Sequence, residues 1–150
     1  HEASAALGTL YNGVTGFSTA SEETQMVIGE TTATLDKLGV NMQDTAAITQ
    51  LLSRSFGMTM EQGADAVGEL AQFARDTGQN VGGLVQDFRQ ASKYLGVFGK
   101  DSTKVFMKTS KLARTLGMDV NELIDSMSKF DTFDSAAESV AGLNGSRQLY

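Results

Sequence analysis

Apolar residues recur every three to four positions along most of this 150-residue chain, and short polar stretches interrupt the pattern at regular intervals. Such spacing places the apolar side chains on one face of an α-helix. No segment of useful length alternates apolar and polar residues as a β-strand does. The pattern predicts helices over residues 2–11, 21–37, 42–55, 60–76, 81–94, 101–115, 120–130 and 133–142.

Five glycines mark the junctions between these predicted helices. They are Gly39, Gly57, Gly78, Gly96 and Gly117, and they follow one another after 18, 21, 18 and 21 residues. Glycine suits the left-handed backbone that often ends a helix. In four cases a residue that can cap the next helix follows two positions later, namely Asn41, Thr59, Asn80 and Asp119. Phe98 and Gly99 interrupt the pattern at the Gly96 junction, so the next helix is expected to begin near residue 100 or 101.

Every second junction glycine is 39 residues from the previous one, which is typical of repeated helical hairpins. We therefore expect an all-α fold of short antiparallel hairpins in repeats of about 39 residues, arranged as a solenoid or an irregular bundle. The expected organisation is an N-terminal helix and loop (1–17), a hairpin-repeat domain (18–143) and a C-terminal tail (144–150). The expected core consists of Leu51, Leu52, Phe56, Met60, Val67, Leu70, Phe73, Leu84, Phe88, Leu95, Val105, Leu112, Leu116, Leu123, Met127 and Phe130.

Composition excludes several kinds of chemistry. The chain has no Cys and a single His at position 1, so disulfides, thiolate nucleophiles, Cys-based zinc sites and multi-His metal sites are excluded. Three carboxylate pairs remain as general acid/base candidates: Glu22 with Glu23, Asp65 with Glu69, and Glu122 with Asp125. Helix N-termini explain Glu22, Glu23 and Glu122, and a solvated helix surface explains Asp65 with Glu69. No phosphate-binding loop occurs. We therefore expect no enzyme, no catalytic or metal-binding residue and no cofactor.

Charge is divided unevenly along the chain, whose net charge is −6. Residues 1–75 hold 9 acidic and 3 basic residues, whereas residues 76–150 hold 9 of each. Residues 89–114 contain seven basic residues against one acid, Asp101. On a helix, four of the lysines form one row beside an apolar stripe of Val105, Thr109, Leu112 and Leu116, flanked by Phe106 and Ala113. The row consists of Lys100, Lys104, Lys108 and Lys111.

Two interpretations of the lysine row remain open. The first is a solvated helix face, and the second is a contact with an anionic partner, either nucleic acid or the acidic first half of another copy. Nucleic acid is disfavoured because the domain as a whole is acidic and no aromatic residues alternate with the lysines. No apolar run approaches the roughly 20 residues that span a bilayer, so no membrane span is expected.

Three segments carry a resemblance to a known class of proteins. They are SFGMTMEQGA (55–64), ARTLGMDVNEL (113–123) and FDTFDSAA (130–137). Within residues 35–140 the chain resembles the tail tape-measure and related large structural proteins of tailed bacteriophages, which are long, helical and poor in Cys and Pro. The resemblance implies a structural role in a virion and brings no catalytic signature. A start without Met and an end that closes no element suggest a fragment of a longer chain.

The expected function is thus a non-enzymatic assembly protein of a phage tail. Its partners would be other virion proteins or copies of itself in a homo-oligomer, and its location would be the virion. The alternative is a helical-repeat interaction module, such as a cytoplasmic adaptor, from a non-viral setting.

Overall fold

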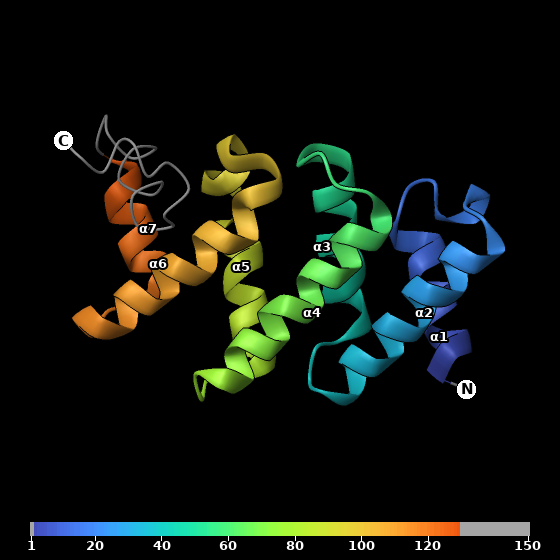
Figure 1. The fold of residues 1–150 in the computed structure, drawn as a ribbon, viewed down its shortest axis with the longest axis horizontal. Coiled ribbons are helices and arrows are strands. Elements are labelled where there is room, and N and C mark those ends of the chain that lie inside the picture. The colour runs from blue at the N-terminus through green and yellow to red at the C-terminus, as the bar shows by residue number, and fades with distance from the viewer. Residues whose placement is uncertain (1, 130–150) are drawn as a thin grey trace. The chain divides into compact units, whose positions relative to one another are not determined.

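The computed structural model describes residues 2–129, and every element in that range is helical (Figure 1). The elements are α1 (Glu2–Gly13), the 3₁₀ helix η1 (Phe17–Thr19), α2 (Glu22–Lys37), α3 (Met42–Ser55), α4 (Met60–Asp76), α5 (Val81–Leu95), the 3₁₀ helix η2 (Gly96–Asp101), α6 (Ser102–Leu116) and α7 (Val120–Ser128). The expected all-α class is therefore confirmed. The 39-residue hairpin repeat stays a prediction, and the expected helix at 133–142 and tail at 144–150 lie outside the described residues.

The chain divides into two compact units, residues 1–86 and 87–150, with the boundary inside α5. In the first unit, α2 and α4 lie side by side, and α1 and α3 lie behind them in Figure 1. Helix α1 packs against α2 and α3, and α4 packs against the same two helices. The four helices thus enclose a common core, and α1 belongs to the first unit.

The core of the first unit forms where these four helices meet. One buried cluster contains Leu10, Val14, Phe17, Ile28, Ala46 and Ala64, with Leu7 and Met60 packed at its edge. Small residues allow the helices to approach closely: a Cβ added at Gly13 would lie 3.1 Å from the Cβ of Ala46, and one added at Gly63 would lie 3.2 Å from the carbonyl oxygen of Thr49. Burial of this apolar surface is the main stabilising contribution to the unit.

The second unit contains the end of α5 together with η2, α6 and α7 in its described part. Helix α6 packs against η2 and α7. Phe88 of α5 meets Phe106 of α6 edge to face, with ring centroids 5.3 Å apart, and both side chains are fully buried. Leu123 and Ile124 of α7 are buried as well. An aromatic pair of this geometry adds to the stabilisation that burial alone provides.

The junctions follow the expected chemistry at four of the five glycines. Gly39, Gly57, Gly78 and Gly117 all have positive φ angles, between 70° and 106°. Asn41 caps α3 by accepting the Asp44 N–H at 2.7 Å, and Asn80 accepts the Gly83 N–H at the same distance. Thr59 forms a full capping box with Gln62 at the start of α4, and Asp119 accepts the Asn121 and Glu122 N–H groups at the start of α7. Each of these contacts satisfies a backbone donor that a helix start leaves free.

The turn expected at Gly96 is not there. The chain passes from α5 directly into η2 at Gly96, and the left-handed residue is Gly99, with a φ of 53°. The Ser102 hydroxyl holds this turn together by donating to the carbonyl oxygens of Leu95, at 2.9 Å, and Gly99, at 2.6 Å. Gly99 therefore lies inside η2 and kinks it, and α6 begins at Ser102.

Most of the expected core lies inside the protein. Leu52, Phe56, Val67, Leu70, Leu84, Phe88, Leu95, Val105 and Leu123 are buried. Leu51, Met60, Phe73, Leu112 and Met127 are half-buried. The prediction that Leu116 belongs to the core is wrong, because 55% of this residue is exposed. It is the last residue of α6 and lies beyond Ala113, the last buried position of that helix. Phe130 lies outside the described residues.

Candidate functional site

Helix α6 is the element that positions the lysine row, and its two ends are fixed locally. Ser102 anchors the first turn through the two hydrogen bonds of its hydroxyl. At the other end, Gly117 adopts a φ of 70°, and the Met118 N–H donates to the carbonyl oxygen of Ala113 at 2.8 Å. A left-handed residue with this bonding pattern is a common helix stop. The helix is therefore held at both ends independently of its exposed face.

One face of α6 belongs to the core. Its buried positions are Ser102, Thr103, Val105, Phe106, Thr109, Ser110 and Ala113. The sequence pattern instead centred the apolar stripe on Val105, Thr109, Leu112 and Leu116. The actual buried face is displaced around the helix toward Phe106, because that ring packs against Phe88 of α5. The Thr109 hydroxyl fits this face by donating to the carbonyl oxygen of Val105 at 2.8 Å.

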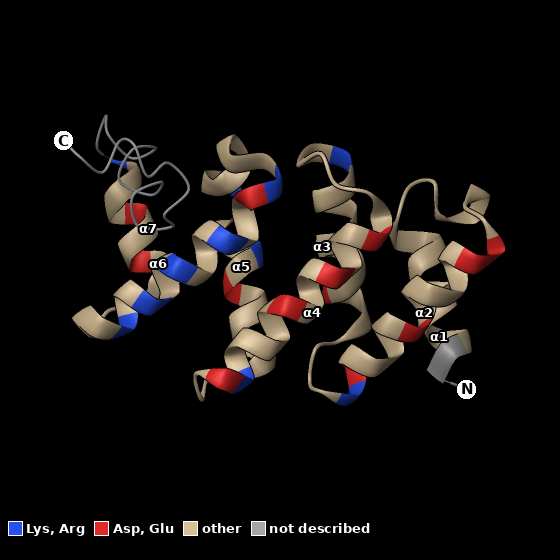
Figure 2. Ribbon diagram, viewed as in Figure 1, with Lys and Arg blue, Asp and Glu red and all other residues tan. Residues whose placement is uncertain are grey.

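The other face of α6 carries the lysines. Lys104, Lys108 and Lys111 lie on α6 and are exposed, whereas Lys100 is exposed on η2 just before the helix. Figure 2 shows Lys and Arg positions following one another along α6. In the described part of the chain, Lys104 and Lys108 form no ion pair, and they are four residues apart on one face. The structure thus presents a basic row, which we call the lysine face (Lys100, Lys104, Lys108 and Lys111).

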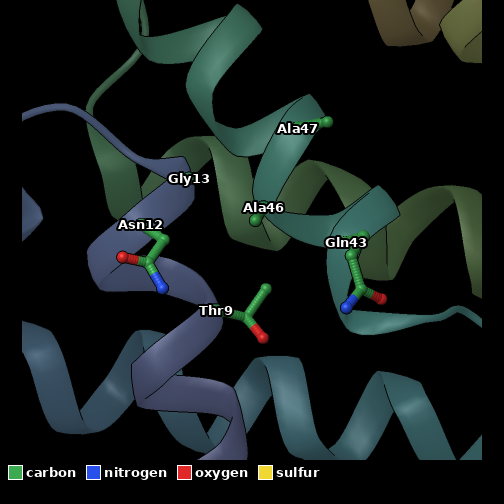
Figure 3. A pocket seen from close by; sticks show the side chains of 6 residues that line it. All are labelled: Thr9, Asn12, Gly13, Gln43, Ala46 and Ala47. Carbon is green, nitrogen blue, oxygen red and sulfur yellow. The ribbon is translucent and has the colours of Figure 1, made fainter.

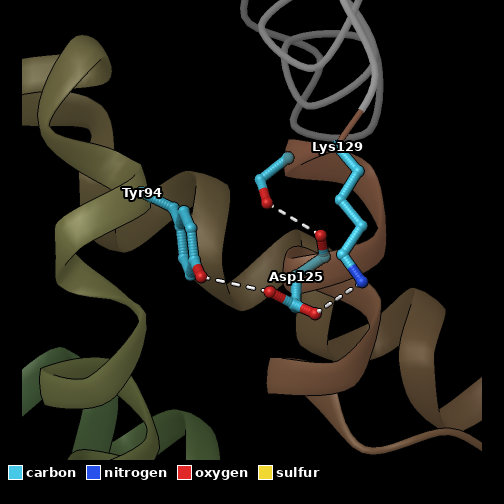
Figure 4. Close-up of polar contacts among 4 residues, drawn as sticks. Tyr94, Asp125 and Lys129 are labelled. Atoms are coloured by element: carbon cyan, nitrogen blue, oxygen red, sulfur yellow. Dashed lines mark hydrogen bonds and ion pairs between the residues drawn. The ribbon is translucent and has the colours of Figure 1, made fainter.

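A second polar arrangement joins α7 to α5. The Tyr94 hydroxyl donates to Oδ1 of Asp125 at 3.1 Å, and the Lys129 ammonium lies 3.3 Å from Oδ2 of the same carboxylate (Figure 4). The hydrogen bond from Tyr94 lowers the pKa of Asp125, and the bond and charge of Lys129 act in the same direction. Tyr94 and Asp125 are 31 residues apart in sequence, and no local pattern linked them.

The start of α7 faces α5 through further polar groups. Asn121 donates through Nδ2 to the carbonyl oxygen of Asp87 and to Oε1 of Gln90, each at 3.4 Å. Partial burial raises the pKa of Asp87, and the nearby charge of Asp119 raises it further. Asp119 thus caps α7 itself, whereas Asp125 links α7 to α5 by accepting from Tyr94. Glu122, which the sequence paired with Asp125 as an acid/base candidate, is exposed in the first turn of α7.

Sequence reasoning missed the shallow pockets between the helices of the first unit, of which two are described. One, of about 360 Å³, lies between α1 and α3 and is lined by Thr9, Asn12, Gly13, Gln43, Ala46 and Ala47 (Figure 3). The other, of about 410 Å³, is a groove between α2 and α4 lined by Val27, Glu30, Thr31, Thr34, Leu35, Leu38 and Gly68. Val27 and Leu38 in this lining are exposed apolar residues, an exposure that only the structure reveals.

Two further findings concern residues 2–129 only. No three or more His, Asp or Glu side chains come together there in a way that could hold a metal ion. None of the helices in this range is both long enough and apolar enough to cross a lipid bilayer.

The described fold and the lysine face define an all-α module with a charged helix surface. Comparisons of the chain with protein-family models, with curated proteins and with solved structures gave no match. A functional assignment therefore rests on the side chains themselves.

Proposed function

We propose that this chain is a non-enzymatic assembly protein that acts by binding protein surfaces, in the first place those of its own copies. The observation that carries this proposal is the lysine face of α6. The opposite face of the helix is committed to the core around Phe88 and Phe106, so the lysines lie on a rigid, well-supported element. A row of exposed like charges on a helix suits recognition of a partner of opposite charge.

The choice of a protein partner follows from the rest of the chain. Residues 1–86 contain ten acidic and three basic residues, whereas residues 87–129 contain five acidic and eight basic residues. The molecule therefore carries its own anionic counterpart to the lysine face. Nucleic-acid-binding proteins are commonly basic overall and alternate aromatic with basic residues, whereas this chain has a net charge of −6 and no aromatic residues alternate with the lysines of the lysine face.

The setting that we propose is the virion of a tailed bacteriophage, with this chain as part of a longer tape-measure-like tail protein. The support is the resemblance of residues 55–64 and 113–123 to such proteins, since both contain a glycine helix stop followed by a cap and an acidic or amide residue. The genes beside the coding sequence test this setting. Tail-tube and baseplate genes on either side would support it, and their absence would favour the non-viral adaptor.

Sedimentation velocity at low and high ionic strength tests the assembly role. The wild-type chain should self-associate at low ionic strength and dissociate as salt is added. Added salt screens the attraction between exposed charges, and the screening length falls to about 8 Å at 0.15 M salt. Lys104→Glu with Lys108→Glu should weaken association and leave the helical circular dichroism unchanged, since both side chains are exposed. A strict monomer that responds neither to salt nor to this reversal would refute the proposal.

A further inference from the structure

The residues that lie 39 positions before the lysine face form a surface of opposite charge. Counting back 39 residues from Lys100, Lys104 and Lys108 leads to Glu61, Asp65 and Glu69. All three acids lie on α4, and all three are exposed. Positions 39 residues apart thus carry acids on α4 and lysines on or just before α6. We call Glu61, Asp65 and Glu69 the acidic face; Figure 2 shows acidic positions along α4.

The acidic face has little compensation within its own unit. Glu61 accepts a hydrogen bond from the Thr24 hydroxyl of α2 at 3.0 Å. Asp65 and Glu69 form no ion pair within residues 2–129, and no basic residue lies three or four positions from either on α4. Like charges at this spacing destabilise a helix by about 0.2–0.5 kcal/mol for each pair. The same holds for Lys104 and Lys108 on α6, so contact between the two faces would relieve both repulsions.

The two faces match in spacing as well as in sign. A helix rises about 1.5 Å per residue, so charges four residues apart are separated by about 6 Å along the axis. Asp65 and Glu69 have this separation, and so do Lys104 and Lys108. Two helices laid together, parallel or antiparallel, therefore bring both lysines opposite both acids. A partner of unrelated sequence would have to reproduce this spacing.

The groove between α2 and α4 supplies apolar surface next to the acidic face. Gly68 lines the groove, and it lies three residues after Asp65 and next to Glu69 in the sequence of α4. Val27 and Leu38 of the groove are 42% and 39% exposed. Glu30, on α2, adds another acid to its lining. The methylene stems of docked lysines can cover such apolar surface while their ammonium groups reach the surrounding carboxylates.

We propose that the acidic face on α4 of one copy binds the lysine face of α6 on a second copy of the chain. This inference rests on the proposed assembly function and names its partner surface. Contacts between exposed charges are individually weak and sensitive to salt, so the association should be steered and oriented by charge. A second copy is the occupant because the chain itself carries both rows with equal spacing and opposite sign.

Charge reversal on both faces tests the proposal. The variants are a basic reversal (Lys104→Glu with Lys108→Glu), an acidic reversal (Asp65→Lys with Glu69→Lys) and a swap that combines all four substitutions. Sedimentation velocity and sedimentation equilibrium at low ionic strength give the association constant and the mass. Each reversal alone should raise the dissociation constant on the order of tenfold or more, and the swap should restore it to within about threefold of wild type. Because the two single reversals become complementary, mixing them should produce a mixed complex.

A matched control separates the position of the charges from the net charge. Lys104→Gln with Lys108→Gln lowers the net charge by two, and so does Gln43→Glu with Gln86→Glu, at exposed sites outside both faces. Only the first pair of substitutions should weaken association. Circular dichroism of every variant checks that the helices remain formed.

The outcomes distinguish this inference from the assembly role itself. If the basic reversal weakens association and the acidic reversal does not, the lysine face binds another surface, and only the present inference is overturned. If the two faces met within one chain, the reversals would change the sedimentation coefficient while the mass stayed that of one chain, which would also overturn it. A wild-type chain that is monomeric under all conditions would overturn the assembly role as well.

Discussion

Gly82 and Gly68 allow the same chemical change to be made at two helical sites with opposite expected effects. A Cβ added at Gly82, in the first turn of α5, would lie 2.7 Å from the carbonyl oxygen of Gly39. This is far inside the roughly 3.5 Å at which such atoms normally pack. Around Gly68, in the middle of α4, no atom lies within 4 Å of an added Cβ. Gly82→Ala should therefore destabilise the first unit, and Gly68→Ala should stabilise it.

The expected magnitudes follow from two opposing contributions. Replacing a helical Gly by Ala contributes about 0.5–1 kcal/mol through the backbone entropy of the unfolded chain. At Gly68 nothing opposes this gain. At Gly82 the added carbon meets a backbone oxygen, and overpacking of this kind typically costs about 1–3 kcal/mol. The net effect of Gly82→Ala should thus be a loss of up to about 2.5 kcal/mol.

Urea unfolding followed by circular dichroism measures both variants. In a chain of this length, 1 kcal/mol corresponds to roughly 2–4 °C in the melting temperature, so thermal unfolding gives an independent check. Gly82→Ala should lower the urea midpoint, and Gly68→Ala should raise it. If Gly82→Ala were as stabilising as Gly68→Ala, the close approach of α5 to the Gly39 turn would not exist.

Two further predictions concern the second unit. Phe106→Ala should cost about 3–5 kcal/mol in urea unfolding, because it removes a fully buried ring, whereas Leu116→Ala should change stability by less than about 0.5 kcal/mol; equal losses would contradict the observed burial. The lowered pKa of Asp125 means that its contacts add stability above its ordinary pKa of 3.8, and this stability is lost as the pH falls through the folded-state value. Tyr94→Phe should therefore lower the urea midpoint at neutral pH, by an amount that shrinks below pH 3.8; a difference independent of pH would refute the role of the hydroxyl.

Local chemistry explains why the helices could be predicted so closely. The ends of α3 and α4 depend on residues within four positions of each end, namely Asn41 and Thr59 as caps and Gly57 and Gly78 as stops. Such interactions depend only on residues that are close in sequence, so local sequence patterns predict them. Gly96 was the exception, because the hydrogen bonds that hold its turn come from Ser102, six residues further along.

The core was harder to predict because polar residues belong to it. Thr32 and Thr109 are buried, and each donates its hydroxyl to the carbonyl oxygen four residues earlier in its own helix. Thr45 and Thr49 on α3 are buried with no hydrogen-bond partner for their hydroxyls in the described structure. Periodicity of apolar residues overlooks such positions, since they are classed as polar. The rotation of α6 toward Phe106 depends on a contact with Phe88, 18 positions away, which no local pattern contains.

The same distinction governs the candidate site. The lysine face is visible in the sequence because its charges lie three or four residues apart, within one helix. The acidic face has equally regular spacing, but Asp65 and Glu69 by themselves indicate only a solvated surface, and their relation to the lysines lies in the offset of 39 residues. Residues that set helix stops and caps leave the exposed positions of each helix free to vary, because those side chains contribute little to folding. Opposite charges at corresponding outer positions can therefore provide recognition between copies without disturbing the core that positions them.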